Sequence, residues 1–234
     1  MGHELTKAMI LAAGLGTRMR PLTLDQPKPL IMLAGKPLIC HCIERIRAVG
    51  IKEIVINLGY HGDMIQSYIQ DGKQWGVEII YTREHPARLL GAGGGVKNAL
   101  PYLGCNRFLL LSADIWTDYP LRKLCEQSLT GYNTLLGVEN SAYYAQGDFT
   151  LLDGETRVKY RKENNVTFAG VGVFTPQYFA QIEKQVFSLM PVIKASIDQQ
   201  LCYGIKITAP YRHVNIGTPQ QLLAIQKEIW AAGM

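Results

Sequence analysis

The sequence contains no long apolar run, and this absence limits what the protein can be. No apolar stretch among its 234 residues approaches the ~18 needed to cross a bilayer, so we expect no membrane span and no membrane partner. The chain also lacks a block of lysines and arginines, and its net charge is only +5, so we expect no nucleic-acid partner. No secretory signal precedes the first apolar segment, which predicts a cytoplasmic protein.

Cysteine is also scarce. Five cysteines are an odd number for a chain of this size, which argues against a disulfide framework. Cys40, His41 and Cys42 are residue types that bind metals, but no second ligand pair follows at the spacing of a zinc site. Because the three residues lie in an amphipathic helical stretch, we expect buried free thiols there.

The first half of the chain alternates two kinds of pattern. Short apolar segments at 8–11, 53–57, 77–81 and 107–112 predict strands. Helical spacing at 37–49, 63–69 and 96–100 predicts helices between them, and Pro101 is expected to close the third. This order predicts an α/β fold with a Rossmann-like mixed, mostly parallel sheet and helices on both faces. Ligands of such sheets bind at the carboxyl ends of the strands.

The second half is less regular. Residues 133–138 can form another strand of the sheet, while 149–152, 158–160 and 166–174 alternate as strands around polar turns. These three segments predict a small β-rich lid. Residues 188–200 and 219–232 have helical patterns, with Thr218 as N-cap and Pro219 at the first helical position. With no tandem repeat or low-complexity linker, the chain 1–234 is expected to be a single domain.

The loop after the first strand carries the main chemical signal. Gly14 and Gly16 let the backbone bring N–H groups close to phosphate oxygens. Arg18 offers a planar fork for a phosphate, and Lys28, between two prolines, adds a compact positive charge. The third glycine of a dinucleotide-binding fingerprint is replaced by Met19, and no Gly-Lys-Ser/Thr triplet of a P-loop is present. The pattern therefore predicts a triphosphate-binding loop of another kind.

A carboxylate follows the fourth strand. Asp114 is well placed there to hold Mg²⁺, a hard cation that proteins bind through one or two carboxylates and substrate phosphates. Taken alone, Asp114 fits a second role equally well, which is to cap the following turn. Because the glycine loop is also present, the interpretation of Asp114 as a magnesium ligand is favoured. The segments 90–95 and 146–149 are each a simple turn or part of a binding site by their residues alone.

The run 11–30 resembles the sugar-nucleotidyltransferase family, whose pattern is L-A-A-G-x-G-T-R-x-x-P-L-T-x-x-x-P-K-P-L. The resemblance implies the nucleotide-diphospho-sugar transferase fold and an Mg²⁺-dependent enzyme that joins a nucleoside triphosphate and a sugar 1-phosphate. Pyrophosphate is then the second product. It also implies a nucleotide-binding part at about 7–140 and a sugar-binding part at about 141–234. No hexapeptide periodicity is present, so no C-terminal β-helix domain is expected.

The resemblance assigns roles to individual positions. Catalytic roles fall on Arg18, Lys28 and Asp114. The residues implied in nucleotide binding are Ala13, Gly14, Gly16, Thr17, Arg18, Lys28, Glu84 (at the base edge) and Gly91. Those implied in sugar binding are Ser112, Gly147 and Asp148, and those implied in metal binding are Asp114 and Asn215.

Three residues at two places depart from the family pattern. Ser112-Ala113 stands where the family has Asn-Gly, which suggests an altered contact to the sugar phosphate. Asn215 stands where the family has a second metal-binding Asp, so Mg²⁺ should bind more weakly than between two carboxylates.

Within the family, the segments 7–14, 18–24, 93–95, 114–118 and 147–149 resemble the short N-acetylmuramate-1-phosphate uridylyltransferases of cell-wall (peptidoglycan) recycling. Trp116-Thr117-Asp118 is narrower than the general family pattern and favours this subgroup, with UTP as the nucleotide. Glucose-1-phosphate thymidylyltransferase, mannose-1-phosphate guanylyltransferase and a non-catalytic nucleotide-sugar-binding module remain alternatives. The oligomeric state stays open.

Overall fold

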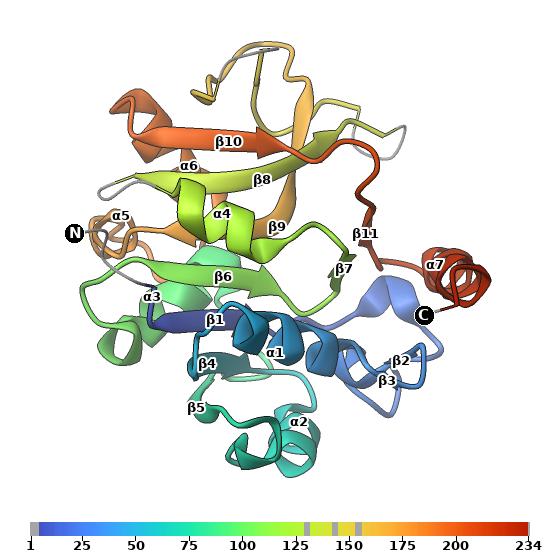
Figure 1. Cartoon of the computed structure of the whole chain (residues 1–234). Helices are drawn as coiled ribbons and strands as arrows, with labels where there is room; N and C mark the ends of the chain where they lie inside the picture. The colour runs from blue at the N-terminus through green and yellow to red at the C-terminus, as the bar shows by residue number, and fades with distance from the viewer. Residues whose placement is uncertain (1–4, 129–131, 142–144, 153–155, 234) are drawn as a thin grey trace.

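A mixed, mostly parallel sheet forms the centre of the molecule in the computed structural model, which describes residues 5–128, 132–141, 145–152 and 156–233. Within these residues the sheet has seven strands in the order β10-β8-β9-β6-β1-β4-β5 (Figure 1). The strands are β1 (Lys7–Leu11), β4 (Glu53–Leu58), β5 (Glu78–Arg83), β6 (Phe108–Ser112), β8 (Asn133–Glu139), β9 (Val166–Phe174) and β10 (Cys202–Lys206). Only β9 runs antiparallel to its neighbours, β6 and β8. The predicted fold class is confirmed.

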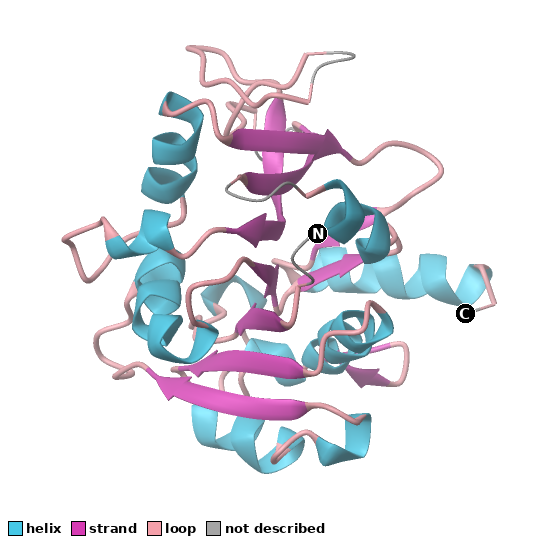
Figure 2. Ribbon diagram, turned by 60° about the vertical axis from the view of Figure 1, so that its left-hand side comes forward, coloured by secondary structure: helices cyan, strands magenta, loops and turns pink. Residues whose placement is uncertain are grey.

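Helices cover both faces of this sheet (Figure 2). They are α1 (Leu38–Ala48), α2 (Gly62–Ile69), α3 (Gly91–Leu103), α4 (Leu121–Gln127), α5 (Gln177–Ala180), α6 (Met190–Asp198) and α7 (Pro219–Ala231). Side chains of α1, α2 and α4 share one buried apolar cluster, and those of α3, α5 and α6 share another. In β1, Ile10 belongs to the first cluster and Met9 to the second, so both faces of the strand are buried. This explains why residues 8–11 of the strand are all apolar.

A smaller ribbon lies beside the sheet. Strands β7 (Ile115–Thr117) and β11 (His213–Asn215) pair antiparallel, next to α7 (Figure 1). The predicted N-cap of α7 is confirmed, because the Thr218 side chain accepts a hydrogen bond from the Gln221 N–H. A short hairpin precedes α1. Its two antiparallel strands, β2 (Met32–Leu33) and β3 (Lys36–Pro37), have two residues each.

Three details of the prediction were wrong. The segments 149–152 and 158–160 are not strands and take part only in isolated bridges, such as the one between Thr150 and Lys159. The segment 166–174 is β9, a strand of the main sheet rather than of a separate lid, although Val166 also bridges to Phe149. Pro101 does not end its helix, since α3 continues to Leu103. Proline has no N–H, so α3 passes through Pro101 without the intrahelical bond that this residue would otherwise donate to the Lys97 carbonyl.

The expected free thiols are confirmed. All five cysteines are free, and Cys40 and Cys42 are buried on α1. Burial raises the pKa of Cys40 to about 11 and that of Cys42 to about 12, so both thiols stay protonated near neutral pH. His41 shares a hydrogen bond of 2.9 Å with the Leu33 carbonyl.

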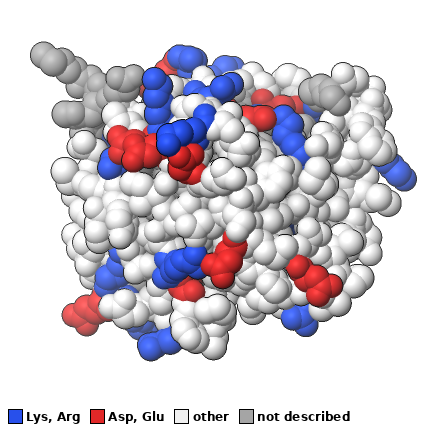
Figure 3. Space-filling model, turned by 90° about the horizontal axis from the view of Figure 1, so that it is seen from below, with Lys and Arg blue, Asp and Glu red and all other residues white. Residues whose placement is uncertain are grey.

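The face seen from below in Figure 1 carries lysines and arginines in small groups mixed with acidic side chains (Figure 3). Ion pairs such as Arg83–Asp63 and Lys73–Asp71 are formed at the surface. Among the described residues, no helix is both long and apolar enough to span a membrane.

Candidate active site

The glycine loop follows β1 and closes on itself. Gly16 has a φ of +62°, the left-handed region that glycine enters without strain. Its carbonyl accepts hydrogen bonds from the Met19 N–H and the Thr23 hydroxyl, at 2.9 and 2.8 Å. A β-carbon on Gly16 would lie 3.1 Å from Cβ of Lys28, so the loop packs closely against this lysine.

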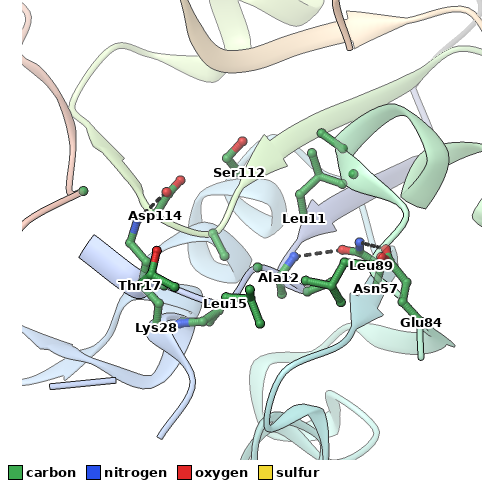
Figure 4. Close-up of a pocket in the computed structure, with 18 of the residues that line it drawn as sticks. Leu11, Ala12, Leu15, Thr17, Lys28, Asn57, Glu84, Leu89, Ser112 and Asp114 are labelled. Carbon is green, nitrogen blue, oxygen red and sulfur yellow. Dashed lines mark hydrogen bonds and ion pairs between the residues drawn. The ribbon is translucent and has the colours of Figure 1, made fainter. Parts of the chain in front are cut away.

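A pocket of about 450 Å³ opens between this loop and the carboxyl ends of β1, β4 and β6. Figure 4 shows Lys28 and Asp114 at one side, Asn57 and Glu84 at the other, and Leu11, Ala12 and Leu15 between them. The structure brings most of the predicted site residues into the wall of this pocket: Ala13, Gly14, Gly16, Thr17, Arg18, Lys28, Glu84, Gly91, Ser112 and Asp114.

Lys28 and Asp114 meet inside the pocket. The Nζ atom of Lys28 donates to Oδ2 of Asp114 at 2.5 Å, although 86 residues separate them in the chain. Lys28 is buried, with only 9% of its surface exposed, and its ammonium group is therefore fixed in position. A buried cation beside a carboxylate is an arrangement suited to phosphate and to a divalent cation.

The far wall is built by a buried polar chain. The Ala12 N–H donates to Oδ1 of Asn57 at 2.8 Å, and Nδ2 of Asn57 donates to Oε1 of Glu84 at 2.6 Å. The second oxygen of Glu84 accepts from the Leu90 N–H at 2.7 Å. Asn57 and Glu84 are 3% and 6% exposed. This chain fixes the start of the glycine loop relative to the start of α3.

The glycines of 91–95 begin α3, and the close packing around them explains why glycine stands there. A β-carbon on Gly95 would lie 2.7 Å from both Asn57 Nδ2 and Glu84 Oε1. On another side of the helix, the N–H groups of Gly93 and Gly94 donate to the Phe187 carbonyl. The helix start is therefore enclosed by the polar chain and by the backbone around Phe187.

Asn215 lies beside Asp114 without lining the pocket. It ends β11 opposite Ile115, and the N–H of the next residue, Ile216, donates to the Asp114 carbonyl at 2.9 Å. Among the described residues, Oδ1 of Asn215 is buried and has no hydrogen-bond partner. An unpaired buried amide oxygen, on a segment whose backbone bonds to that of Asp114, fits a cation ligand.

The residues present fit Mg²⁺ better than a metal held by protein alone. The described part of the chain has no group of three or more His, Cys, Asp or Glu side chains placed to hold a metal. His213 lies near Asp114. Burial lowers the pKa of its ring to about 4, although the negative charge of Asp114 raises it, so the ring is neutral near pH 7. A site of one carboxylate and one amide suits a cation bound largely through substrate phosphates.

Only one of the three predicted sugar-binding residues lines the pocket. Ser112 lines the pocket, and a β-carbon on Gly170 of β9 would lie 3.2 Å from its hydroxyl. Gly147 and Asp148 lie outside the residues that line the pocket. Asp148 accepts a hydrogen bond from the Phe168 N–H at 2.8 Å and so supports the start of β9.

Sequence reasoning missed Asn57. The available signal was an amide near the carboxyl end of the strand Glu-Ile-Val-Ile-Asn-Leu, whose other residues after the first are apolar. At that edge of a parallel sheet, a buried polar side chain points to a binding site or to its support. Gly217, whose β-carbon would lie 3.2 Å from Arg18 Nη2, was also missed as a pocket residue.

The fold and this pocket define a nucleotide-handling α/β protein, and the comparisons agree. The family model described as nucleotidyl transferase matches residues 7–136. The chain belongs to this family, as the glycine loop predicted.

The similarity to individual relatives extends over nearly the whole chain. An N-acetylmuramate alpha-1-phosphate uridylyltransferase of Neisseria meningitidis is 40% identical over 94% of this chain and 96% of its own. The protein of the same name from Caulobacter vibrioides is 32% identical, over 95% and 96%. The mannose-1-phosphate guanylyltransferase catalytic subunit beta of Drosophila melanogaster is 29% identical over 93% of this chain and 61% of its own. The predicted resemblance to the sugar-phosphate nucleotidyltransferases is confirmed.

Solved structures show the same fold. A UDP-glucose pyrophosphorylase complexed with UDP-glucose has a TM-score of 0.81 at 17% identity, over 97% of this chain and 99% of its own. HddC from Yersinia pseudotuberculosis complexed with GMP-PN has a TM-score of 0.74 at 22% identity, over 96% and 100%. At these identities the likeness concerns the fold alone.

Proposed function

We propose that this protein transfers the uridylyl group of UTP to N-acetylmuramate 1-phosphate, with release of pyrophosphate. The observation that carries the type of reaction is the Lys28–Asp114 pair inside the pocket, beside the glycine loop and Arg18. The particular substrates are supported by the full-length similarity to the Neisseria meningitidis relative of that name.

The chemistry needs positioning and charge neutralisation rather than a base. An oxygen of the sugar 1-phosphate, already ionised near neutral pH, attacks the α-phosphorus of the nucleotide in line. A new oxygen–phosphorus bond forms, the bond from the α-phosphorus to the bridging oxygen breaks, and pyrophosphate leaves with that electron pair. Both reactants are anions, so the main tasks of the protein are to hold them together and to balance their charge.

Each cationic residue has a part in this scheme. Arg18, on the 3₁₀ turn Thr17–Met19, stabilises the leaving pyrophosphate. Lys28 exchanges part of its contact with Asp114 for the α-phosphate and the incoming sugar phosphate. Backbone N–H groups of the loop at Gly14 and Gly16 bind the remaining phosphate oxygens.

We include Mg²⁺ in the proposal, with Asp114 and Asn215 as the residues that would hold it. When bound, this cation neutralises phosphate charge in the reacting nucleotide. The amide of Asn215 contributes an oxygen but no negative charge, so the protein depends more on Asp114 and on the substrate phosphates for affinity.

Glu84 is the residue of the pocket that we expect at the base edge. Each of its oxygens accepts one hydrogen bond within the protein, and a carboxylate has acceptor capacity left over. Uracil, thymine and guanine can donate to it from a ring N–H, and cytosine and adenine from an exocyclic amino group. This contact therefore does not select the base, and thymidylyl and guanylyl transfer stay the alternatives that an experiment must separate.

The experiment is pyrophosphate release over a matrix of four nucleoside triphosphates and three sugar 1-phosphates, with Mg²⁺. The sugars are N-acetylmuramate, glucose and mannose 1-phosphates. We expect turnover with UTP and N-acetylmuramate 1-phosphate at least tenfold above every other pair. Preference for dTTP with glucose 1-phosphate, or for GTP with mannose 1-phosphate, contradicts the proposed substrates. Nucleotide binding without turnover of any pair contradicts the proposal that the protein is an enzyme and favours a non-catalytic nucleotide-sugar-binding module.

A further inference from the structure

Three consecutive residues beyond Asp114, namely Trp116, Thr117 and Asp118, have no part in the proposed reaction, yet all three contact Arg212. The Thr117 hydroxyl donates to the Arg212 carbonyl at 2.7 Å. Asp118 accepts from the Arg212 backbone N–H at 2.6 Å and from its Nε–H at 2.8 Å. The Arg212 guanidinium carbon lies 5.1 Å from the centre of the Trp116 ring. One arginine is therefore held through its backbone, its guanidinium and its π-contact.

These contacts are at the far end of the ribbon that carries the proposed metal ligands. Arg212 directly precedes β11, and Thr117 ends β7. The register pairs His213 with Thr117 and Asn215 with Ile115. Asp114 therefore precedes β7, and Asn215 ends β11, at the same end of the ribbon.

The ribbon needs such support. Two short strands alone are marginally stable in water, and a slip of one residue turns every side chain of a strand to the opposite face. A slip here would turn the Asn215 side chain to the opposite face of the ribbon and break the hydrogen bond from the Ile216 N–H to the Asp114 carbonyl. Thr117 is 2% exposed, and the Asp118–Arg212 pair is about two-thirds buried, so these contacts are partly shielded from water.

We infer that Trp116, Thr117 and Asp118 form a clamp on Arg212 that sets the register of β7 and β11 and thereby places Asn215 beside Asp114. They are positioning residues, since none of them lines the pocket. The clamp rests on the proposed function in one respect, which is the assignment of Asn215 as a ligand of Mg²⁺.

The first test follows the clamp in the protein alone. Amide hydrogen exchange is measured for residues 213–217 in the wild type, Arg212→Met and Asp118→Asn. Asp198→Asn is the matched control, because Asp198 forms an exposed ion pair with Lys194, away from the ribbon. We expect the Ile216 amide to exchange roughly tenfold faster in the two clamp variants and at the wild-type rate in the control. Unchanged exchange in Arg212→Met overturns the clamp.

The second test follows the metal. The Mg²⁺ concentration for half-maximal pyrophosphate release should rise roughly tenfold in Arg212→Met, as found when a residue that orients a ligand is lost. The affinity for UTP without metal should stay within twofold, which a general loss of structure would not preserve. Faster exchange with an unchanged Mg²⁺ requirement overturns the positioning of Asn215.

The two tests also separate this inference from the proposed function. If the wild type turns over no substrate pair, the proposed function fails, while hydrogen exchange still decides the clamp. If Arg212→Met and Asp118→Asn do not fold, Thr117→Val takes their place. It keeps a similar shape and removes the hydroxyl that holds the Arg212 carbonyl. Exchange of Ile216 must then quicken, and a wild-type rate overturns the clamp.

Discussion

Lys28 is the residue on which most of the site depends. It is buried, it is in contact with Asp114, and it borders the glycine loop from the other side. A lysine in such a place has lost much of its hydration and its freedom, so its charge is directed at whatever enters the pocket.

Replacing Lys28 by Met should therefore lower turnover with little change in shape. We expect kcat for pyrophosphate release to fall by roughly 10²–10³, the scale for loss of one electrostatic stabiliser. Lys36→Met is the control, because Lys36 pairs with Glu44 at the surface. A Lys28→Met enzyme with more than a tenth of wild-type kcat would remove this lysine from the mechanism.

Asn215 offers a prediction in the opposite direction. Asn215→Asp restores a second carboxylate beside Asp114, so the Mg²⁺ concentration for half-maximal activity should fall on the order of tenfold. The control is Asn106→Asp, since Asn106 is exposed in the turn that precedes β6, at the other end of that strand. An identical Mg²⁺ dependence in wild type and Asn215→Asp refutes the deficit ascribed to the amide.

At the same scale, the sequence predicted the residues of the pocket unevenly. Those in the loop 13–28 were found because phosphate chemistry restricts which residue types can stand there, and Asp114 because a carboxylate closes an apolar strand. Asn57 was missed because its role depends on Glu84, 27 residues away, and no local pattern encodes that pairing. The proposed roles of these residues stay predictions until variants are measured.

At the scale of elements, the polar chain of Asn57 and Glu84 joins β1, β4 and the start of α3 into one frame. Two N–H donors point at the two oxygens of Glu84. An amide in its place can accept only one of them and leaves the other unpaired in a buried position.

Glu84→Gln should thus destabilise the fold by about 1–3 kcal/mol, the cost of one buried unpaired donor. The melting temperature should fall by about 2–4 °C for each of these kcal/mol. The KM for the nucleotide should rise more than that for the sugar phosphate, because the chain supports the loop and the base wall. Thermal unfolding measures the loss of stability, and steady-state kinetics measures the two KM values. Equal changes in the KM values for the nucleotide and for the sugar phosphate contradict a role of Glu84 on the nucleotide side of the pocket.

Elements differ in how well the sequence predicts them for a physical reason. Strands β1, β4, β5 and β6 were found because both faces of each are covered, which gives apolar runs. β10 was not predicted, because its mixed sequence Cys-Tyr-Gly-Ile-Lys contains no apolar run; it is defined by pairing with β8 and by a bridge from Tyr203 to Arg157. The place of β9 between β6 and β8 also depends on pairing between distant segments, which no local periodicity reports.

At the scale of the whole molecule, the end of the described chain closes the site that its beginning builds. A third buried cluster contains Met19 from the glycine loop, Ile216 next to Asn215, and Ile225 and Ile229 from α7. The Ala34 N–H also donates to Oε1 of Gln226 at 3.0 Å, across 192 positions of the chain. Helix α7 therefore packs against the two segments that carry Arg18 and the proposed metal ligand.

Ile225→Ala tests this coupling. Ile225 is 1% exposed, so its truncation leaves a cavity and should cost about 2–5 kcal/mol in the free energy of unfolding, read from urea denaturation. Leu223→Ala on the same helix is the matched control: Leu223 is 60% exposed, and its loss should change stability by less than about 0.5 kcal/mol. Because Met19 and Ile216 belong to the same buried cluster as Ile225, nucleotide affinity should weaken in Ile225→Ala at temperatures where the protein is still folded. If α7 only covers the buried cluster, the nucleotide affinity stays at the wild-type value while the free energy of unfolding falls. The helix then has no part in placing Arg18.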